Sequence, residues 1–319
     1  MHPENINTTE FMLVGFKNLH SFRIFVFVLF LLIYIFTLSG NLLIILLVAT
    51  NARLHSPMYF FLCNLSISEV VFTTNIVPNM LDNLLSEDGS ISLPGCLTQY
   101  YFFSSTATTE CLLLAIMSYD RYLAICRPLH YSSLMNFQMC FQTATWAWLA
   151  GLTISMVTLI LLCKSHFCGP NVIDNFFCDL SPLIELSCSN KFIIEIESFI
   201  FASLLTLFPF VFIITTYCMI LYNIYKIPSS NGRKKAFSTC SSHLAVVATY
   251  YGTLIIMYVA PSRKQIFNIS KALSLLYTVV TPLLNPIVYS LRNKEIHIAL
   301  NAILIHFTKH FNKHASSSL

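Results

Sequence analysis

Charged side chains are scarce in this sequence of 319 residues. Asp, Glu, Lys and Arg together make up 10% of the chain, whereas a water-soluble domain carries about 25%. The mean hydropathy of +0.70 points the same way. Because a surface with so few charges cannot face water over most of its area, the composition excludes a soluble enzyme.

Glycine is also rare, with 8 residues, while 56% of the residues are hydrophobic. A collagen triple helix needs glycine at every third position, and a disordered chain contains far less apolar surface than this. The chain is too long for a small scaffold held together by disulfides. These absences leave an integral membrane protein, and we predict an all-α one.

Long apolar runs predict seven membrane-spanning helices, each of which needs about 20 apolar residues. Within such helices every backbone polar group is bonded internally, as a bilayer requires. The runs lie at about 24–49, 58–81, 98–126, 141–163, 195–225, 237–260 and 272–291. We therefore predict a single domain over 1–319, with a tail over 1–23, a seven-helix bundle over 24–291 and a second tail over 292–319.

Lysine and arginine favour one orientation of this bundle. If the N-terminus lies outside the cell, more of these residues fall on the cytoplasmic side than outside, as is typical of membrane proteins. Residues 1–23 lack the pattern of a cleaved signal peptide, so we expect none. Asn7-Thr8-Thr9 is a glycosylation sequon, which a lumenal tail would expose. We predict an extracellular N-terminus, a glycan on Asn7 and, after an odd number of spans, a cytosolic C-terminus.

Most of the 11 cysteines fall within the predicted spans, where a small side chain packs well. Cys96, Cys168, Cys178 and Cys188 fall in the predicted outer segments, where oxidising conditions permit disulfides. Four cysteines allow three pairings, which the residues alone do not rank. A metal site of His166, Cys168 and Cys178 is the less favoured alternative, because no CxxC spacing is present.

Several polar residues stand inside the apolar spans. Asp120-Arg121-Tyr122 ends the third span, and Asn285-Pro286-Ile287-Val288-Tyr289 closes the seventh, where Pro286 frees a backbone carbonyl and lets the helix kink. Asn41 lies in the first span and Glu69 in the second. Polar groups in apolar helices are unfavourable unless they meet in the interior, so we predict a bonded network that links spans one, two and seven.

Sequence blocks in five of the spans and their flanks carry a family resemblance. The blocks are Gly40-Asn41, Pro57–Leu62, Met117–Cys126, Pro128–Tyr131, Lys235–His243, Pro282–Pro286 and Tyr289–Asn293. With these blocks the chain resembles a rhodopsin-like (class A) G-protein-coupled receptor and, within that class, an olfactory (odorant) receptor. The block Lys235–His243 is specific to odorant receptors, whereas Asn-Pro-x-x-Tyr is shared by the wider class.

This resemblance implies a function. It implies a multi-pass receptor of the plasma membrane, not an enzyme, that binds a small volatile odorant and activates a heterotrimeric G protein. By resemblance, that G protein is the stimulatory olfactory type, which raises cyclic AMP. We expect membrane lipid as the other partner, no nucleic acid and no cofactor beyond a structural or allosteric Na⁺.

The resemblance also assigns roles to particular residues. It pairs Cys96 with Cys178 and Cys168 with Cys188. It implies that Asp120 holds Arg121 in the inactive state and releases it toward the G protein on activation. The residues of this switch are Asp120, Arg121, Tyr122, Asn285, Pro286 and Tyr289.

Glu69 and Glu110 are carboxyl groups in neighbouring spans. By resemblance they form a Na⁺ site, with Asn285 nearby, that favours the inactive state. The alternative is that one or both carboxyls are protonated and simply hydrogen-bonded. The receptor family often has Asp where Glu69 stands, and both interpretations remain open.

The candidate ligand pocket contains apolar and hydroxyl side chains without an acid or base. The position that carries a carboxylate in aminergic receptors is Phe103 here, and no Lys lies in the middle of span seven to bind retinal. These absences favour a small, neutral volatile ligand. The candidates are Phe103, Ser104, Ala107, Thr108 and Cys111 in span three, Phe201, Leu205 and Thr206 in span five, Tyr251, Leu254, Ile255 and Tyr258 in span six, and Thr278 in span seven.

Each of these residues could instead serve ordinary helix packing. Tyr251 and Tyr258 are favoured as ligand contacts, because a buried phenol needs a hydrogen-bond partner, and Tyr251 could alternatively act as a switch. After span seven, Ile296, Leu300, Ile303, Leu304 and Phe307 recur at helical spacing and predict a short amphipathic helix on the cytosolic leaflet.

Three other classes compete with this interpretation. A transporter would show internal repeats, and none is found. A membrane enzyme would need a clustered nucleophile, base or metal set, whereas the histidines here are scattered. The serious rival is a non-olfactory class A receptor for a lipid or small metabolite, which would have a larger outer domain or a charged pocket.

Overall fold

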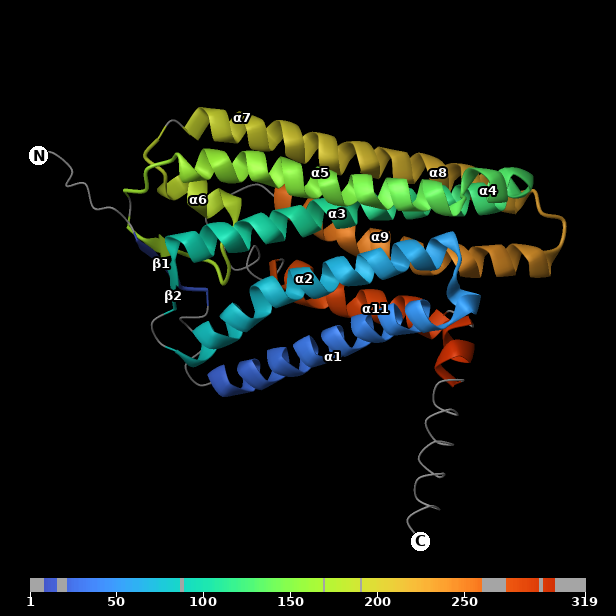
Figure 1. Ribbon diagram of the computed structural model, residues 1–319, viewed down its shortest axis with the longest axis horizontal. Helices are drawn as coiled ribbons and strands as arrows, with labels where there is room; N and C mark the ends of the chain where they lie inside the picture. Colours follow the sequence, from blue (N-terminus) through green and yellow to red (C-terminus); the bar gives the residue numbers. More distant parts are fainter. Residues whose placement is uncertain are drawn as a thin grey trace, which may run out of the picture.

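The computed structural model describes residues 9–15, 22–86, 89–168, 170–189, 191–259, 274–292 and 295–301. Within these residues the chain forms a bundle of seven helical spans (Figure 1). Five spans are single helices: α1 (Arg23–Thr50), α2 (Pro57–Leu85), α3 (Leu93–Cys126), α5 (Phe137–Cys163) and α9 (Ser230–Val259). The fifth span joins α7 (Lys191–Ala202), the π-turn η2 (Ser203–Leu207) and α8 (Phe208–Tyr225), and the seventh joins the π-turn η4 (Leu276–Val280) to α11 (Thr281–Arg292).

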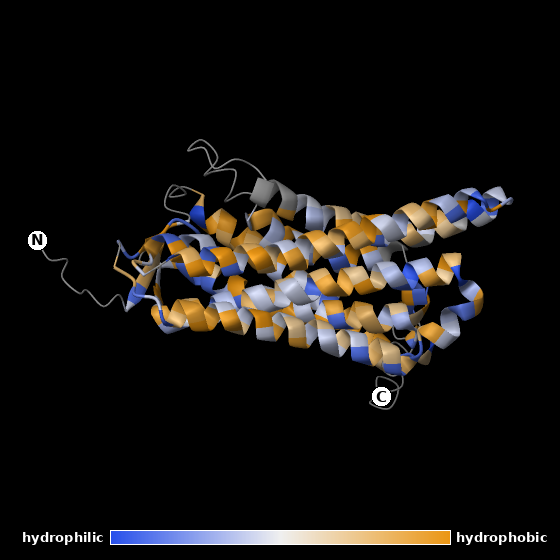
Figure 2. Ribbon diagram, turned by 90° about the horizontal axis from the view of Figure 1, so that it is seen from above, coloured by the Kyte–Doolittle hydropathy of each residue, from blue (hydrophilic) through white to orange (hydrophobic). Residues whose placement is uncertain are grey.

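The two ends of the bundle differ. Short strands and the short helix α6 (Leu180–Leu186) lie at one end, called the strand end, as Figure 1 shows on the left. At the opposite end, called the α4 end, lie α4 (Pro128–Leu134), the 3₁₀ turn η1 (Ala52–Leu54) and the connection from α8 to α9. Figure 2 shows hydrophobic residues along the lengths of the helices and hydrophilic ones gathered toward both ends.

The outer surface of the bundle is apolar where lipid would lie. Of the described helices, α1, α2, α5 and the continuous α7–α8 segment are long and apolar enough to cross a membrane by composition alone. By contrast, α3 contains Glu110, Asp120 and Arg121, and it packs against α2, α5, α8 and α9. Its polar residues are therefore shielded by neighbouring helices, as charges inside a membrane protein must be.

Local sequence signals set the helix starts. The Ser92 hydroxyl accepts the Gly95 N–H at 3.2 Å and caps α3, which therefore begins before the apolar run that predicted it. The Asn136 side chain accepts the Met139 N–H at 2.8 Å and caps α5. Helix α9 begins at Ser230 and so extends beyond the predicted span at its polar end. The apolar run could not reveal this turn, although Arg233, Lys234 and Ala236 favour helix.

Both π-turns lie just before a proline. Pro209 follows η2 and Pro282 follows η4, each at the same distance from the end of the turn. Proline has no N–H to donate to the carbonyl four residues earlier, and its ring pushes that carbonyl away, which widens the turn. For Pro209 the freed carbonyl is that of Leu205, which accepts instead from the Cys111 thiol at 2.8 Å.

A small sheet closes the strand end. Strand β1 (Glu10–Leu13) lies between β2 (Ser90–Ser92), with which it is antiparallel, and β3 (Val172–Ile173), with which it is parallel. Phe11 of β1 is 1% exposed and packs edge-to-face on Phe167 at 5.4 Å between ring centroids. The sequence did not predict this sheet, because strands of two to four residues have no hydrophobic pattern to detect.

The segment after span seven is helical over 295–301. Ile296 is 3% exposed and belongs to the main core, while Leu300 is half-buried. The rest of the predicted amphipathic stripe, Ile303, Leu304 and Phe307, lies outside the described residues, as does Asn7.

Candidate functional site

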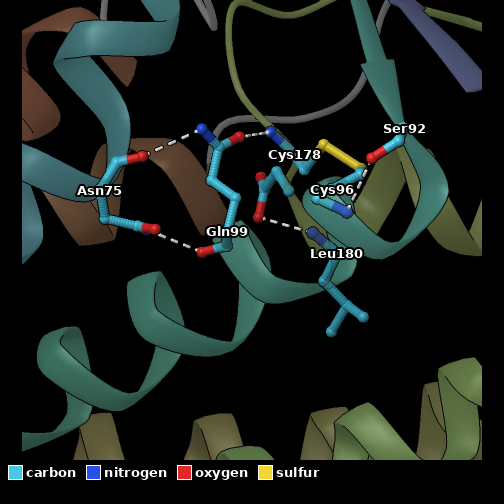
Figure 3. Close-up of a disulfide and its surroundings, with 8 residues drawn as sticks. Asn75, Ser92, Cys96, Gln99, Cys178 and Leu180 are labelled. Carbon is cyan, nitrogen blue, oxygen red and sulfur yellow. Dashed lines mark hydrogen bonds between the residues drawn. A yellow bond between two sulfur atoms is a disulfide. The ribbon is translucent and has the colours of Figure 1, made fainter.

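Two disulfides hold the segment between α5 and α7. Cys96 is bonded to Cys178 and Cys168 to Cys188, the same two pairs that the family resemblance implied. The first disulfide ties this segment to the start of α3, as Figure 3 shows. Because Cys168 and Cys178 are both in disulfides, neither is available as a metal ligand with His166.

Gln99 fixes the position of Cys178 more closely. Its side-chain oxygen accepts the Cys178 N–H at 2.9 Å, and its amide group donates to the Asn75 carbonyl at 3.1 Å (Figure 3). The Asn75 amide in turn donates to the Gln99 carbonyl at 2.8 Å. The segment Cys178–Leu180 is therefore tied to both α2 and α3.

Below this segment lies a cavity of about 150 Å³. An apolar cavity of about this size can hold a molecule such as benzene. Among the predicted pocket residues, those that line the cavity are Phe103, Ser104, Ala107, Thr108, Cys111, Phe201, Leu205, Thr206 and Leu254. They come from α3, α7, η2 and α9. Residues that the helical spacing in the sequence assigned to one pocket therefore line the same cavity.

Two other predicted pocket residues face elsewhere. The Tyr251 hydroxyl lies 2.9 Å from the Cys111 sulfur, and its ring packs on Phe210 rather than on the cavity. The Thr278 hydroxyl donates to the Ser274 carbonyl of its own helix at 2.7 Å and is fully buried. The side chains of Ile255 and Tyr258 lie outside the described residues.

The cavity also has lining residues that the sequence did not predict: Tyr100, Ile154, Thr158, Asp179, Leu180, Ser198, Ala202, Tyr250 and Tyr277. Tyr250 and Tyr277 each stand one position before a predicted residue, which is a rotation of about 100° around the helix. Asp179 follows Cys178 directly, so the pairing of Cys178 with Cys96 was the signal that could have found it.

The acidic lining residue Asp179 lies at the strand end of the cavity. Asp179 is the N-cap of α6, and one of its carboxylate oxygens accepts the Leu180 N–H at 2.7 Å. Burial raises the pKa of the Asp179 carboxyl above its ordinary value, and the Leu180 hydrogen bond offsets part of that effect. Nearby, the Thr158 hydroxyl donates to a Glu197 carboxylate oxygen at 2.7 Å.

At the α4 end, Asp120 and Arg121 form an ion pair. The Arg121 guanidinium donates twice to one Asp120 oxygen, at 2.7 and 3.1 Å, and the Tyr131 hydroxyl of α4 donates to the other at 2.8 Å. Burial, followed by the neighbouring Asp120 carboxylate, raises the pKa of Tyr131, so its hydroxyl stays protonated and remains a donor. Asp120 is fully buried and has donors on both oxygens.

Other buried polar groups surround this pair. The Tyr217 hydroxyl lies 2.6 Å from His243 Nδ1, and the Thr216 hydroxyl donates to Ser118 at 3.2 Å. Within the described part of the chain, His243 Nε2 and the Tyr289 hydroxyl are buried without a hydrogen-bond partner. Tyr122 stacks on Tyr119 at 6.2 Å between ring centroids.

Midway along the bundle lies a group of buried oxygens. The Asn285 amide donates to Glu69, and Glu110 interacts electrostatically with Glu69. Over the described residues, Glu69 Oε2, Glu110 Oε1 and Asn285 Oδ1 have no hydrogen-bond partner. Buried, unpartnered oxygens suit a hard cation such as Na⁺, and they equally suit a proton held between the carboxyls, so both predicted interpretations stay open.

The predicted network of spans one, two and seven is only partly formed in this structure. Glu69 and Asn285 join spans two and seven. The Asn41 amide donates at 3.1 Å to the Thr37 carbonyl, which is one turn away on its own helix. Span one instead meets span seven by close packing, since a Cβ at Gly40 would lie 3.1 Å from Pro286.

The bundle of seven spans has an Asp-Arg pair at one end and a small cavity toward the other, and its last span contains an Asn-Pro-x-x-Tyr block. These features together define a class A G-protein-coupled receptor. Such a protein is not an enzyme.

Comparison with known proteins identifies the family. The sequence model of the family described as olfactory receptor matches residues 30–307. The human olfactory receptor 11L1 is 48% identical over 305 residues, which cover 95% of each chain. The human olfactory receptor 11A1 is 46% identical over 300 residues, which cover 94% of this chain and 95% of the relative. The mouse olfactory receptor 1M1 is 45% identical over 305 residues, which cover 95% of this chain and 97% of the relative. The chain belongs to the olfactory receptor family, whose members are multi-pass proteins of the plasma membrane that respond to odorants through G proteins.

Proposed function

We propose that this receptor binds small volatile odorants in the cavity among α3, α5, α7, η2, α9 and η4 and then activates the stimulatory olfactory G protein, which raises cyclic AMP. The observation that carries the proposal is the cavity itself, because its lining combines apolar side chains with a few hydroxyls and, at the strand end, the carboxyl of Asp179. Such a lining suits a small molecule that leaves water readily. The body of the ligand is neutral, since the cavity beside Phe103, Ala107 and Leu254 has no charged side chain.

We also propose how the chain is divided into domains and how it is oriented in the membrane. The chain forms one receptor domain over 1–319, with the strand end and the N-terminus outside the cell and the α4 end and the C-terminus in the cytosol. Two disulfides at the strand end support this orientation, because disulfides persist in oxidising surroundings. Arg127, Arg233 and Lys234 at the α4 end support it as well, since cytoplasmic segments are enriched in basic residues. A glycan on Asn7 would agree with it.

Ligand binding would be transmitted through the deep end of the cavity. Cys111 lines the cavity and bonds to both the Leu205 carbonyl and the Tyr251 hydroxyl. These contacts connect α3 to the π-turn before Pro209 and to α9. A ligand that moves Cys111 or Leu205 would therefore change how α8 and α9 pack against α3, which is the kind of two-state shift that a ligand can bias.

At the cytosolic end, this shift would release Arg121. Asp120 holds Arg121 while Tyr131 holds Asp120, and Tyr217 is bonded to His243 of α9. Arg121 also interacts electrostatically with His243. If α9 moves outward, Tyr217 loses its partner, His243 moves away from Arg121, and Arg121 can exchange Asp120 for the G protein. Tyr122 and the Asn285–Tyr289 segment complete the switch. The Tyr289 hydroxyl, which has no hydrogen-bond partner among the described residues, can then form a new contact.

A Na⁺ ion would favour the inactive state in this mechanism. Glu69, Glu110 and Asn285 would hold it, and it would supply a positive charge that neutralises the two carboxylates. A proton shared between the carboxyls is the alternative. Replacing external and internal Na⁺ by a large organic cation separates the two, because basal cyclic AMP rises only if Na⁺ stabilises the inactive form.

The test is a screen of volatiles in cells that express the receptor and the olfactory G protein, with cyclic AMP as readout. Ala107→Trp should fill the cavity and abolish the response at unchanged surface expression. Ala49→Trp on the exposed face of α1 is the matched control and should respond normally. No response to any volatile, together with a response to a lipid or peptide, would overturn the proposal.

A further inference from the structure

The cavity changes in chemistry along its depth. Toward the strand end it is lined by Tyr100, Ser104, Thr158, Asp179 and Ser198. Deeper in the bundle the described lining has no charged side chain and combines apolar residues with the hydroxyls of Thr108, Thr206, Tyr250 and Tyr277. Cys111 lies seven residues beyond Ser104 on α3, or about 10 Å along the helix. A ligand that fills the cavity would therefore present a polar group at the strand end and an apolar body below it.

The charged group at the polar end is a carboxylate that the fold holds in place. Asp179 follows Cys178, which is tied to α3 by a disulfide and by the 2.9 Å hydrogen bond to Gln99. One Asp179 oxygen is bonded to the Leu180 N–H, and the side chain lines the cavity. No Lys, Arg or His side chain lines the cavity in the part of the chain that the structure describes.

A second carboxylate stands beside the same end. Glu197 lies one helical turn before Phe201, which lines the cavity, and its Oε1 accepts the hydroxyl of Thr158, another lining residue. Over the described residues, its Oε2 is buried and has no hydrogen-bond partner. Tyr100 interacts electrostatically with both Asp179 and Glu197, so the two acids flank one region. Ionised carboxylates only accept hydrogen bonds, so two acceptor groups stand among the hydroxyls of that region.

We infer that this end of the cavity binds a hydrogen-bond donor on the odorant, and that the preferred donor is a protonated primary amine. The inference rests on the proposed function, because it names the head group of the ligand in that cavity. An ammonium group supplies three donors and a positive charge, which match an unpartnered carboxylate oxygen, a second carboxylate and the hydroxyls beside them. The apolar chain of a small alkylamine would fill the deeper part.

This inference revises the expectation of a fully neutral ligand. That expectation came from the absence of a carboxylate at Phe103 in span three. In the structure the Asp179 carboxylate reaches the cavity from the N-cap of α6, and Glu197 of α7 stands beside the cavity, bonded to its lining residue Thr158.

The decisive experiment compares amines, alcohols and aldehydes that share the same linear, branched and cyclic carbon frames. With cyclic AMP as readout, wild-type receptor should respond to an amine at lower concentration than to the matching alcohol, and aldehydes should be weakest because they offer no donor. Asp179→Asn and Glu197→Gln should each raise the amine concentration needed by about tenfold or more, as loss of a charge-assisted hydrogen bond predicts. They should leave the aldehyde response unchanged or improved, because an amide can donate to a carbonyl.

The matched control is Glu195→Gln, since Glu195 is an exposed acid two residues from Glu197 on the same helix. It should leave the amine response unchanged. Surface protein is measured for every variant, and the wild-type ranking tests the inference even if a variant fails to reach the membrane. Aldehydes that match or exceed amines on wild-type receptor would overturn the inference.

The outcomes separate this inference from the proposed function. If Ala107→Trp abolishes every volatile response but amines have no advantage, the cavity is the ligand site and the amine assignment is wrong. If Ala107→Trp leaves the responses intact, or no volatile acts at all, the proposed site or function has failed first.

Discussion

The two ends of the bundle hold their polar groups by different means. At the strand end, two disulfides, a three-stranded sheet and the paired amides of Asn75 and Gln99 fix the chain around the cavity. At the α4 end, the polar groups are held by one ion pair and single hydrogen bonds, and some of them have no partner among the described residues. A rigid frame keeps a small cavity in shape, whereas exchangeable bonds allow a switch. The difference indicates which end recognises the ligand and which end moves.

The largest effect should come from breaking the frame of the strand end. Cys96→Ser removes the disulfide that links α3 to Cys178, which lies 82 residues further along the chain. Loss of a native disulfide costs about 2–5 kcal/mol, so we expect most of the receptor to be lost from the cell surface. Flow cytometry of surface-labelled cells measures this loss. Cys163→Ser, which changes a free and exposed cysteine, is the control and should reach the surface normally.

A change at the α4 end should affect signalling and spare folding. Arg121→Gln removes the cation of the ion pair, and the Asp120 carboxylate keeps its hydrogen bond from Tyr131. We expect near-normal surface protein and no ligand-driven rise in cyclic AMP. If cyclic AMP still rises in this variant, Arg121 does not contact the G protein in the way proposed, and the contrast between the two ends is weakened.

Glycine substitutions should show which side of the bundle is tightly packed. A Cβ at Gly151 of α5 would collide with the Ser105 carbonyl and the Thr109 hydroxyl of α3, whereas a Cβ at Gly252 of α9 would meet nothing within 4 Å. Gly151→Ala should therefore destabilise the receptor by about 1–3 kcal/mol through overpacking. Gly252→Ala should be neutral or slightly stabilising, because alanine favours helix. Thermal unfolding of detergent-solubilised receptor compares them, and equal melting temperatures would contradict this account.

The sequence predicted the spans and only part of the cavity, for physical reasons. Apolar runs long enough to cross a bilayer are unmistakable, so all seven spans were located within a few residues except at the polar end of α9. On α3 the helical spacing identified Phe103, Ala107 and Cys111 together. On α9 the prediction included Leu254, which lines the cavity, but took Tyr251 in place of its neighbour Tyr250. On η4 it took Thr278 in place of Tyr277, because neighbouring tyrosine and threonine side chains do not distinguish one helix face from the next. Asp179 was missed because a loop has no periodicity, and only its disulfide neighbour indicates where it lies.

The smallest effect concerns pH at the strand end. Burial raises the pKa of Asp179, so lowering the external pH should protonate this carboxyl earlier than an exposed Asp. Its charge is present above the raised pKa and lost below it, while an alkylamine stays protonated throughout, as a Lys side chain does. Amine potency should therefore fall a few-fold on mild acidification, and the potency of the matching alcohol should change less. Glu197 and Tyr100 also face this region, so Asp179→Asn is needed to assign the effect. If the variant keeps the full pH dependence of the amine response, another group titrates and the strand end does not sense pH through Asp179.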